Sequence, residues 1–245
     1  MPTRVNLADV PVAILAGGLA TRLGALTTAS PKALLDLNGE PFIAHQLRLL
    51  HARGIRRVVL CLGFLGEMVV DYVDRQQKFG LDVQYSFDGP TLLGTAGALR
   101  QAASPLGPVF FVLYGDSYLP CDYGEVLAAF EAQGRLALMT VFQNENRYDR
   151  SNVEFENGEI RAYDKRESTP AMHHIDYGLG VLSGSCLESV PEGQPYDLAA
   201  LYQDLLARGQ LGVYEAHERF YEVGSVGGIE EMREYLRLTT AGGAQ

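Results

Sequence analysis

Apolar residues occur in short runs along the first part of the chain, and longer stretches with an apolar position every three or four residues separate these runs. Short runs rich in β-branched residues are typical of strands buried on both faces of a parallel sheet. We therefore predict strands over residues 12–15, 58–62, 83–87, 109–113 and 136–142. The intervening stretches have the period of amphipathic helices, and we predict helices over residues 41–53, 68–79, 94–103 and 123–132.

The pattern changes near residue 150. Two short segments, 153–156 and 159–163, flank Asn157-Gly158, a dipeptide that strongly favours a β-hairpin. A further strand is expected over 175–182, and helices over 198–207 and 229–238. Alternating strands and helices predict an α/β fold, a three-layer sandwich with a mostly parallel central sheet and ligands at the carboxyl ends of the strands. No linker or repeat interrupts the chain, so we expect one domain over residues 1–245.

The segment that follows the first strand has the composition of a phosphate-binding loop. The strand leads directly into Gly17-Gly18, and the cations Arg22 and Lys32 come next. Glycines at the end of a buried strand allow backbone N–H groups to approach an anion closely. The combination predicts a cradle for a polyphosphate; the alternative is an ordinary glycine turn with two solvated cations.

Two common phosphate-binding motifs are excluded by spacing. No Gly-Lys-Ser/Thr triplet follows Gly17 or Gly18 at the distance that the P-loop requires. The dinucleotide fingerprint Gly-x-Gly-x-x-Gly does not fit Gly17, Gly18 and Gly24. An oxidoreductase on a dinucleotide-binding fold is therefore not expected.

A carboxylate follows the strand at 109–113, where Gly115-Asp116 places it at the rim of the predicted sheet. Magnesium prefers oxygen ligands from one or two carboxylates together with substrate phosphates. Asp116 beside a phosphate cradle suits that role, and the alternative is an Asx turn.

The order of residues 15–23, Leu-Ala-Gly-Gly-Leu-Ala-Thr-Arg-Leu, followed by Pro31-Lys32, resembles the signature of the sugar-1-phosphate nucleotidyltransferases, the nucleotide-sugar pyrophosphorylases. That signature usually reads Leu-Ala-Gly-Gly-x-Gly-Thr-Arg-Leu and then Pro-Lys-Pro, so the chain departs from it at Ala20 and Ala33. The resemblance extends from about Val12 to Tyr235. It implies a Rossmann-like nucleotidyltransferase fold with a nucleotide-binding half, about 10–150, and a sugar-phosphate-binding half, 151–238. We expect no C-terminal β-helix of the kind that many relatives append.

The resemblance also implies roles for individual residues. Catalytic charge neutralisation falls to Arg22 and Lys32. The segment 220–225 resembles one whose acid is the second metal ligand, so magnesium is expected on Asp116 and Glu222, the latter in place of the usual Asp. The residues implied in nucleotide binding are Leu15, Ala16, Gly17, Gly18, Thr21, Leu93, Gly94, Thr95, Gly97 and Gly115. Those implied in sugar-phosphate binding are Asp164, Lys165, Asp176 and Gly178.

The reaction that the resemblance implies joins an NTP and a sugar 1-phosphate into an NDP-sugar with release of pyrophosphate. A sugar phosphate is already a nucleophile at neutral pH, so catalysis reduces to alignment and charge neutralisation. The loop at 93–98 looks most like that of guanylyltransferases for mannose- or heptose-type 1-phosphates. The alternatives are a uridylyl- or cytidylyltransferase, or a non-catalytic nucleotide-sugar sensor, which the departures at Ala20, Ala33 and Glu222 motivate.

Composition narrows the choice of binding partners and of cellular location. The net charge of −10 disfavours a nucleic-acid partner. No apolar stretch is long enough for a bilayer span, and three separate cysteines suit reduced thiols in a cytoplasmic protein. The pair His173-His174 suggests a metal site. Adjacent side chains on a strand point in opposite directions, however, and could not bind one ion together, so we expect these histidines to lie on a surface loop. The expected partners are therefore the two small-molecule substrates and magnesium. The sequence leaves open whether the chain forms a homo-oligomer.

Overall fold

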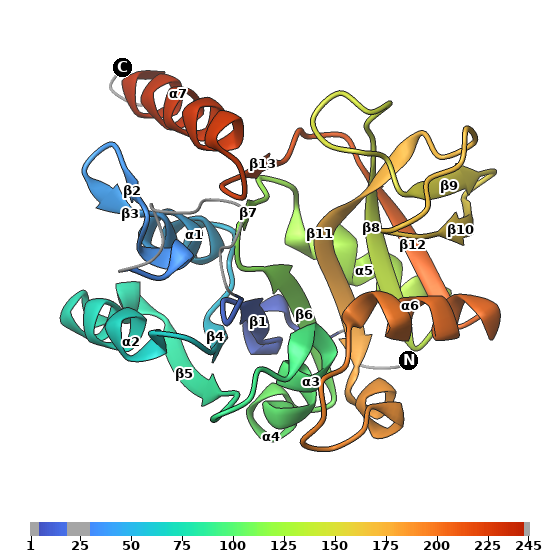
Figure 1. Ribbon diagram of the computed structural model, residues 1–245, viewed down its shortest axis with the longest axis horizontal. Coiled ribbons are helices and arrows are strands. Elements are labelled where there is room, and N and C mark those ends of the chain that lie inside the picture. The colour runs from blue at the N-terminus through green and yellow to red at the C-terminus, as the bar shows by residue number, and fades with distance from the viewer. Residues whose placement is uncertain (1–4, 19–29, 243–245) are drawn as a thin grey trace.

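A nine-stranded sheet forms the centre of the computed structural model, which describes residues 5–18 and 30–242 (Figure 1). The strand order is β10-β9-β11-β6-β1-β4-β5, with β8 beside β11 and β12 beside β8. The strands are β1 (Val12–Leu15), β4 (Arg57–Leu62), β5 (Asp82–Phe87), β6 (Val109–Tyr114), β8 (Ala137–Gln143), β9 (Val153–Glu156), β10 (Glu159–Tyr163), β11 (His174–Ser183) and β12 (Leu211–Ala216). All strands expected from the apolar pattern are present.

Strands β5, β4, β1 and β6 run parallel and carry the first half of the chain. Their side chains alternate between two cores: Val12 and Ile14 pack on one face of the sheet, and Ala13 on the other. The helices are α1 (Phe42–Ala52), α2 (Gly66–Arg75), α3 (Gly94–Gln101), α4 (Ala103–Leu106), α5 (Tyr123–Gln133), α6 (Leu198–Ala207) and α7 (Val226–Gly242).

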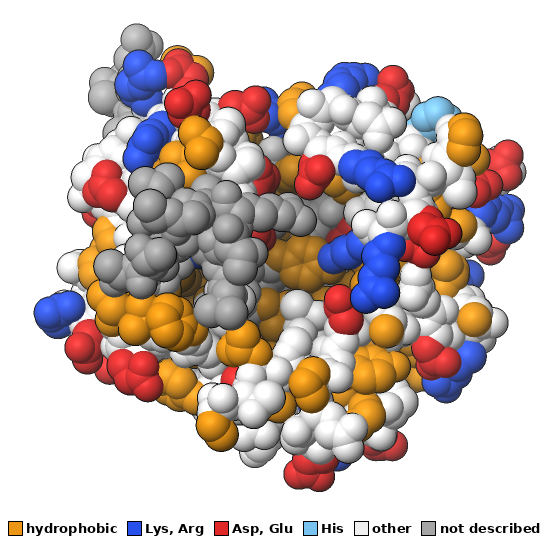
Figure 2. Space-filling view, viewed as in Figure 1, with side chains coloured by type: hydrophobic (Ala, Val, Ile, Leu, Met, Phe, Trp, Pro, Cys, Tyr) orange, Lys and Arg blue, Asp and Glu red, His pale blue; other side chains and the backbone are white. Residues whose placement is uncertain are grey.

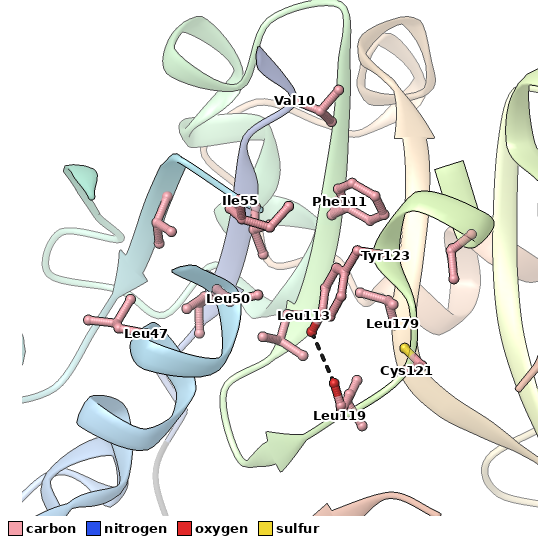
Figure 3. Packing of buried hydrophobic residues seen from close by; sticks show 14 of the residues in the cluster. Val10, Leu47, Leu50, Ile55, Phe111, Leu113, Leu119, Cys121, Tyr123 and Leu179 are labelled. Carbon is pink, nitrogen blue, oxygen red and sulfur yellow. Dashed lines mark hydrogen bonds between the residues drawn. The ribbon is translucent and has the colours of Figure 1, made fainter. Parts of the chain in front are cut away.

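Helices cover both faces of this sheet, which confirms the three-layer sandwich. One face packs against α1, α2 and α5, and the other against α3 and α6. Figure 3 shows the first of these cores, where Leu47 and Leu50 of α1 and Tyr123 of α5 converge on Phe111 and Leu113 of β6. These five side chains are buried almost completely.

Several helix boundaries differ from the pattern, and α7 covers Val226–Gly242 where 229–238 was expected. Pro41 precedes α1 as its N-cap instead of opening the helix. Helix α2 ends at Arg75, and the short helix η4 (Gln77–Gly80) follows, because Lys78 adopts a left-handed backbone conformation that no α-helix continues. The helix expected over 94–103 divides into α3 and α4 at Ala102.

Strand β11 joins the parallel half to an antiparallel second half by pairing with both β6 and β8. The hairpin β9–β10 lies where Asn157-Gly158 predicted it. Strand β12, which the apolar pattern missed, runs parallel to β8. Gly212 and Glu215 interrupt its apolar pattern, and the strand is recognisable only from its partner.

The C-terminal segment returns to the carboxyl ends of the central strands, where a very short strand of it pairs with another very short strand. β13 (Tyr221–Glu222) pairs with β7 (Ser117–Tyr118), apart from the main sheet (Figure 1). The backbone N–H of Val223 also donates to the carbonyl of Asp116 at 2.9 Å. A second small pair joins β2 (Asp36–Leu37) to β3 (Glu40–Pro41). No helix among the described residues is both long and apolar enough to span a bilayer.

Candidate active site

A cavity of about 330 Å³ opens at the carboxyl ends of β1 and β6. Figure 2 views this face, which is hollowed between the two halves of the molecule. The chain contains three lysines, and two of them, Lys32 and Lys165, line the cavity. The lining residues are Leu15, Ala16, Gly18, Lys32, Ala33, Thr95, Tyr114, Gly115, Asp116 and Lys165. Parallel strands direct their carboxyl ends to one edge, where such folds bind ligands.

The predicted glycines at this edge have different structural roles: two allow close backbone contact, and one borders the cavity. A Cβ on Gly115 would overlap the carbonyl oxygen of Leu15, and one on Gly17 would come within 2.9 Å of the Gly63 nitrogen. Both glycines therefore allow neighbouring backbones to approach. A Cβ on Gly18 would meet no described atom within 4 Å, and Gly18 lines the cavity directly. Of the cradle, Thr21 and Arg22 lie outside the described residues.

Lys32 and Asp116 meet in this cavity. Lys32 opens the short helix η3 (Lys32–Leu34), and Asp116 follows β6. Their Nζ and Oδ2 atoms are 3.1 Å apart, and both side chains are partly exposed. An ion pair of this kind gives little stability, so each charge is available to a ligand.

The structure also brings Glu222 to Asp116. A Cβ on Gly224 would lie 2.5 Å from Oε2 of Glu222 and 3.4 Å from Oδ2 of Asp116, so both carboxylates reach the same point. Glu222 also accepts hydrogen bonds from the Gly224 N–H and from Ser225 Oγ, at the start of α7. Two carboxylates that meet beside a phosphate site fit the oxygen ligands of magnesium. No cluster of three or more His, Cys, Asp or Glu residues that could hold a metal occurs within residues 5–18 and 30–242.

Lys165 is held by a buried cluster at the same cavity. Its Nζ donates to the hydroxyl of Tyr114 at 2.8 Å, lies 3.3 Å from Oδ2 of Asp176, and sits 4.2 Å from the centre of the Tyr114 ring. Burial opposes the charged form of Lys165, but the neighbouring Asp176 and Tyr163 outweigh this effect and raise the pKa of the ammonium above its ordinary value. Lys165 is thus a fixed cation.

The other residues implied in sugar-phosphate binding have local partners. Asp164 accepts from the N–H groups of Glu167 and Arg166, which lower the pKa of its carboxyl, and it does not line the cavity. Gly178 has φ +92°, and a Cβ there would press on Ser117 Oγ and the Tyr114 ring, at 3.0 and 3.2 Å. The structure therefore brings Lys165, but not Asp164, to the cavity.

A second cavity of about 150 Å³ adjoins the first. Its lining is mostly small or apolar, and Asp88 is the one charged residue among the described residues that line it. Oδ2 of Asp88 accepts from the Leu93 N–H at 3.0 Å, and burial raises the pKa of the carboxyl. The lining residues are Leu15, Gly17, Gly18, Cys61, Asp88, Leu92, Gly94, Thr95 and Ala98. Asp88 is not among the residues predicted from the sequence, although a carboxylate directly after β5 repeats the position of Asp116 after β6.

The predicted nucleobase loop fixes α3 against the segment that precedes α6. Thr95 Oγ1 donates to Asp197 at 3.0 Å and accepts from the Leu198 N–H at 2.7 Å. Leu93 is buried, and a Cβ on Gly97 would lie 2.9 Å from the carbonyl oxygen of Gln194. Of the four predicted residues, Gly94 and Thr95 line one or both of these two cavities, and Leu93 and Gly97 line neither.

Two expectations about histidine and cysteine have clear outcomes. His173 is exposed and precedes the strand, as expected for a surface loop, whereas His174 belongs to β11. The His174 ring packs on Phe155, and its Nε2 lies 3.1 Å from Glu215. The cysteines are free and buried, as expected for reduced thiols, and burial raises the pKa of Cys61 to about 12.

Comparison with known proteins identifies the family. The sequence profile of the Nucleotidyl transferase family matches residues 12–161, and the chain belongs to this family. The catalytic subunit beta of mannose-1-phosphate guanylyltransferase from Xenopus tropicalis is 25% identical over 217 residues, 86% of this chain and 60% of the relative. The probable mannose-1-phosphate guanylyltransferase 1 of Oryza sativa subsp. japonica is 29% identical over 184 residues, 72% of this chain and 51% of the relative. The chain thus spans little more than half the length of these curated relatives.

Solved structures share the fold. HddC from Yersinia pseudotuberculosis, crystallised with GMP-PN, superposes with a TM-score of 0.77 at 22% identity and covers 93% of this chain and 99% of its own. A putative glucose-1-phosphate thymidylyltransferase from Bacillus anthracis gives a TM-score of 0.81 at 20% identity, with coverage of 93% and 95%. These similarities confirm the expected Rossmann-like nucleotidyltransferase fold.

Proposed function

We propose that the protein transfers a nucleotidyl group from an NTP to a sugar 1-phosphate, with GTP as the donor and a mannose- or heptose-type 1-phosphate as the acceptor. The observation that carries this proposal is a single cavity that collects Lys32, Asp116 and Lys165 from distant parts of the chain. The family and the names of the guanylyltransferase relatives support the same reaction.

Each charged residue of the cavity has a role in this reaction. An oxygen of the sugar phosphate forms a bond to the α-phosphorus of the NTP, and the bond to the departing pyrophosphate breaks. Lys32, with Arg22, neutralises charge on the triphosphate and the leaving group, and Lys165 holds the phosphate of the acceptor. Asp116 and Glu222 would hold magnesium, which supplies further positive charge to the phosphates when bound. The protein aligns reactants and stabilises charge, so no side chain has to act as a nucleophile.

The smaller cavity supports guanine as the base. A carboxylate accepts hydrogen bonds only, and guanine presents the N1–H and the 2-amino group side by side. Asp88 can accept both, whereas uracil and thymine offer one such donor. The rest of the lining is small or apolar, which suits the faces of a planar base. The alternative is a uridylyl- or cytidylyltransferase, with UTP or CTP as the donor.

The test measures pyrophosphate release and NDP-sugar formation with GTP, ATP, UTP and CTP against mannose 1-phosphate and glucose 1-phosphate. We expect turnover with GTP and mannose 1-phosphate. Asp88→Asn should lower kcat/KM for GTP by about 30-fold, because a charge-assisted hydrogen bond is lost, and should leave the weaker activity with UTP nearly unchanged. Asp82→Asn, which changes an exposed carboxylate at the opposite end of β5, is the control.

Equal preference among the nucleotides in both variants would contradict the guanine assignment. Binding of GTP without any release of pyrophosphate would instead identify a nucleotide-sugar sensor.

We further propose that the two halves of the domain divide the substrates, with residues 10–150 binding the nucleotide and residues 151–238 the sugar phosphate. The positions of Asp88 and Lys165 after β5 and after β10 support this division. Buried free thiols support a cytoplasmic location.

A further inference from the structure

Asp176 lies in β11 at the centre of a group of hydrogen-bond donors. Its Oδ2 accepts from the hydroxyls of Tyr114 and Tyr163 at 2.7 and 3.0 Å, and it pairs with Lys165. Its Oδ1 accepts from the Gly178 N–H at 3.0 Å. The side chain is only 3% exposed.

We propose that Asp176 is a positioning residue whose carboxylate holds Lys165 and Tyr114 in place at the cavity, and that it does not contact the sugar. This inference rests on the proposed function, because it assigns how the acceptor-binding lysine is kept in position. It replaces the direct sugar contact that the sequence resemblance implied.

Burial separates the carboxylate from a sugar hydroxyl, because the side chain is only 3% exposed and does not line the cavity. Both oxygens also have donors within the protein. The members of the group come from β6, β10 and β11, and the residue Lys165 follows β10. A charge-assisted network of this kind fixes the orientation of each member and is costly to leave partly satisfied.

The network has a consequence for the charge of Lys165. The described groups that face its ammonium are Asp176, Tyr114 and Tyr163, and Tyr202 of α6 borders Asp176. The Lys165 side chain is 37% exposed, so the charge of Asp176, the one carboxylate among these groups, is the main influence that raises its pKa, and removal of that charge lowers the pKa. A lysine with a raised pKa keeps its charge as the pH increases, whereas one with a lowered pKa loses it.

The experiment measures the KM for mannose 1-phosphate, with GTP and magnesium saturating, from pH 7.5 to 10. The phosphate is fully ionised across this range, since its second pKa is about 6. We expect the ratio of KM in Asp176→Asn to KM in the wild type to rise by about twofold towards pH 10, as Lys165 begins to lose its proton. A ratio that does not change with pH overturns the proposal.

Two further variants separate positioning from a general structural role. Asp74 accepts from Tyr85 at 2.6 Å and lies 3.7 Å from Lys78, so it has the same kinds of partner far from the cavity. Asp74→Asn should leave the pH profile unchanged. Lys165→Arg should abolish the pH dependence that Asp176→Asn introduces, because arginine stays charged throughout; a persistent dependence in the double variant overturns the proposal.

A measurement on the wild type keeps the proposal testable if Asp176→Asn fails to fold. The chain has three lysines, so their ¹³Cε resonances can be assigned with Lys165→Arg and followed against pH. Lys165 should titrate above the ordinary lysine pKa of about 10.4, and a midpoint below that value overturns the proposal. This titration needs no turnover, so an inactive wild type would refute the proposed function while leaving the inference about Asp176 open to its own result.

Discussion

Glu222 accepts hydrogen bonds just before α7 and, in the proposed function, would also hold magnesium, and one substitution tests both roles. Glu222→Gln keeps the size of the side chain and removes its charge. The carboxylate accepts two hydrogen bonds at the start of the 17-residue helix α7, and it shares a point near Gly224 with the carboxylate of Asp116. We expect the substitution to weaken both the helix start and the metal site.

The two effects have different magnitudes. A negative charge at a helix N-terminus contributes about 0.5–1 kcal/mol, so the midpoint of thermal unfolding should fall by about 1–4 °C in a protein of this size. Loss of one of two anionic ligands should raise the magnesium concentration for half-maximal rate at least about tenfold, since even the partners that orient a ligand are worth that much. The KM for the sugar phosphate should change little.

The assay records initial rates of pyrophosphate release across a magnesium titration, and thermal unfolding without magnesium. Glu230→Gln removes the same charge from an exposed position of α7 and serves as the control. If unfolding shifts while the magnesium requirement stays the same, Glu222 only supports the segment that precedes α7, and the metal assignment is refuted. If only the KM for the sugar phosphate rises, the carboxylate contacts the acceptor instead.

Two predictions concern the ion pair in the cavity. Lys32→Ala should lower kcat/KM by about a hundredfold, the cost of one lost charge-stabilising contact in the transition state, with little change in thermal stability because the pair with Asp116 is partly exposed; steady-state kinetics with a normal rate would contradict the assignment of the cradle. Asp116→Asn should abolish turnover at ordinary magnesium concentrations and regain part of it when magnesium is raised, because an amide is a poorer ligand for a hard cation. Asn forms turns as well as Asp does, so an unchanged magnesium titration would show that Asp116 is only a turn residue.

Local pattern was sufficient to predict most of the fold. Strand β1 and its parallel neighbours are short apolar runs, and the hairpin β9–β10 depends on the turn chemistry of Asn157-Gly158. Such signals depend only on residues that are close together in the sequence. Strand β12 and the two-residue strands β7 and β13 carry no comparable signal, because they exist only through pairing with distant segments.

The sequence by itself determined which charged residues are candidates for the site, since Lys32, Asp116 and Lys165 stand in an order that resembles a known signature. Tertiary structure alone decided which side chains meet. Lys165 and Tyr114 are 51 positions apart, yet their Nζ and hydroxyl oxygen are 2.8 Å apart. The approach of Glu222 to Asp116 follows from the pairing of β13 with β7. The physical reason is that proximity between distant segments depends on packing of the whole sheet, whereas periodicity and turn chemistry act between neighbours along the chain.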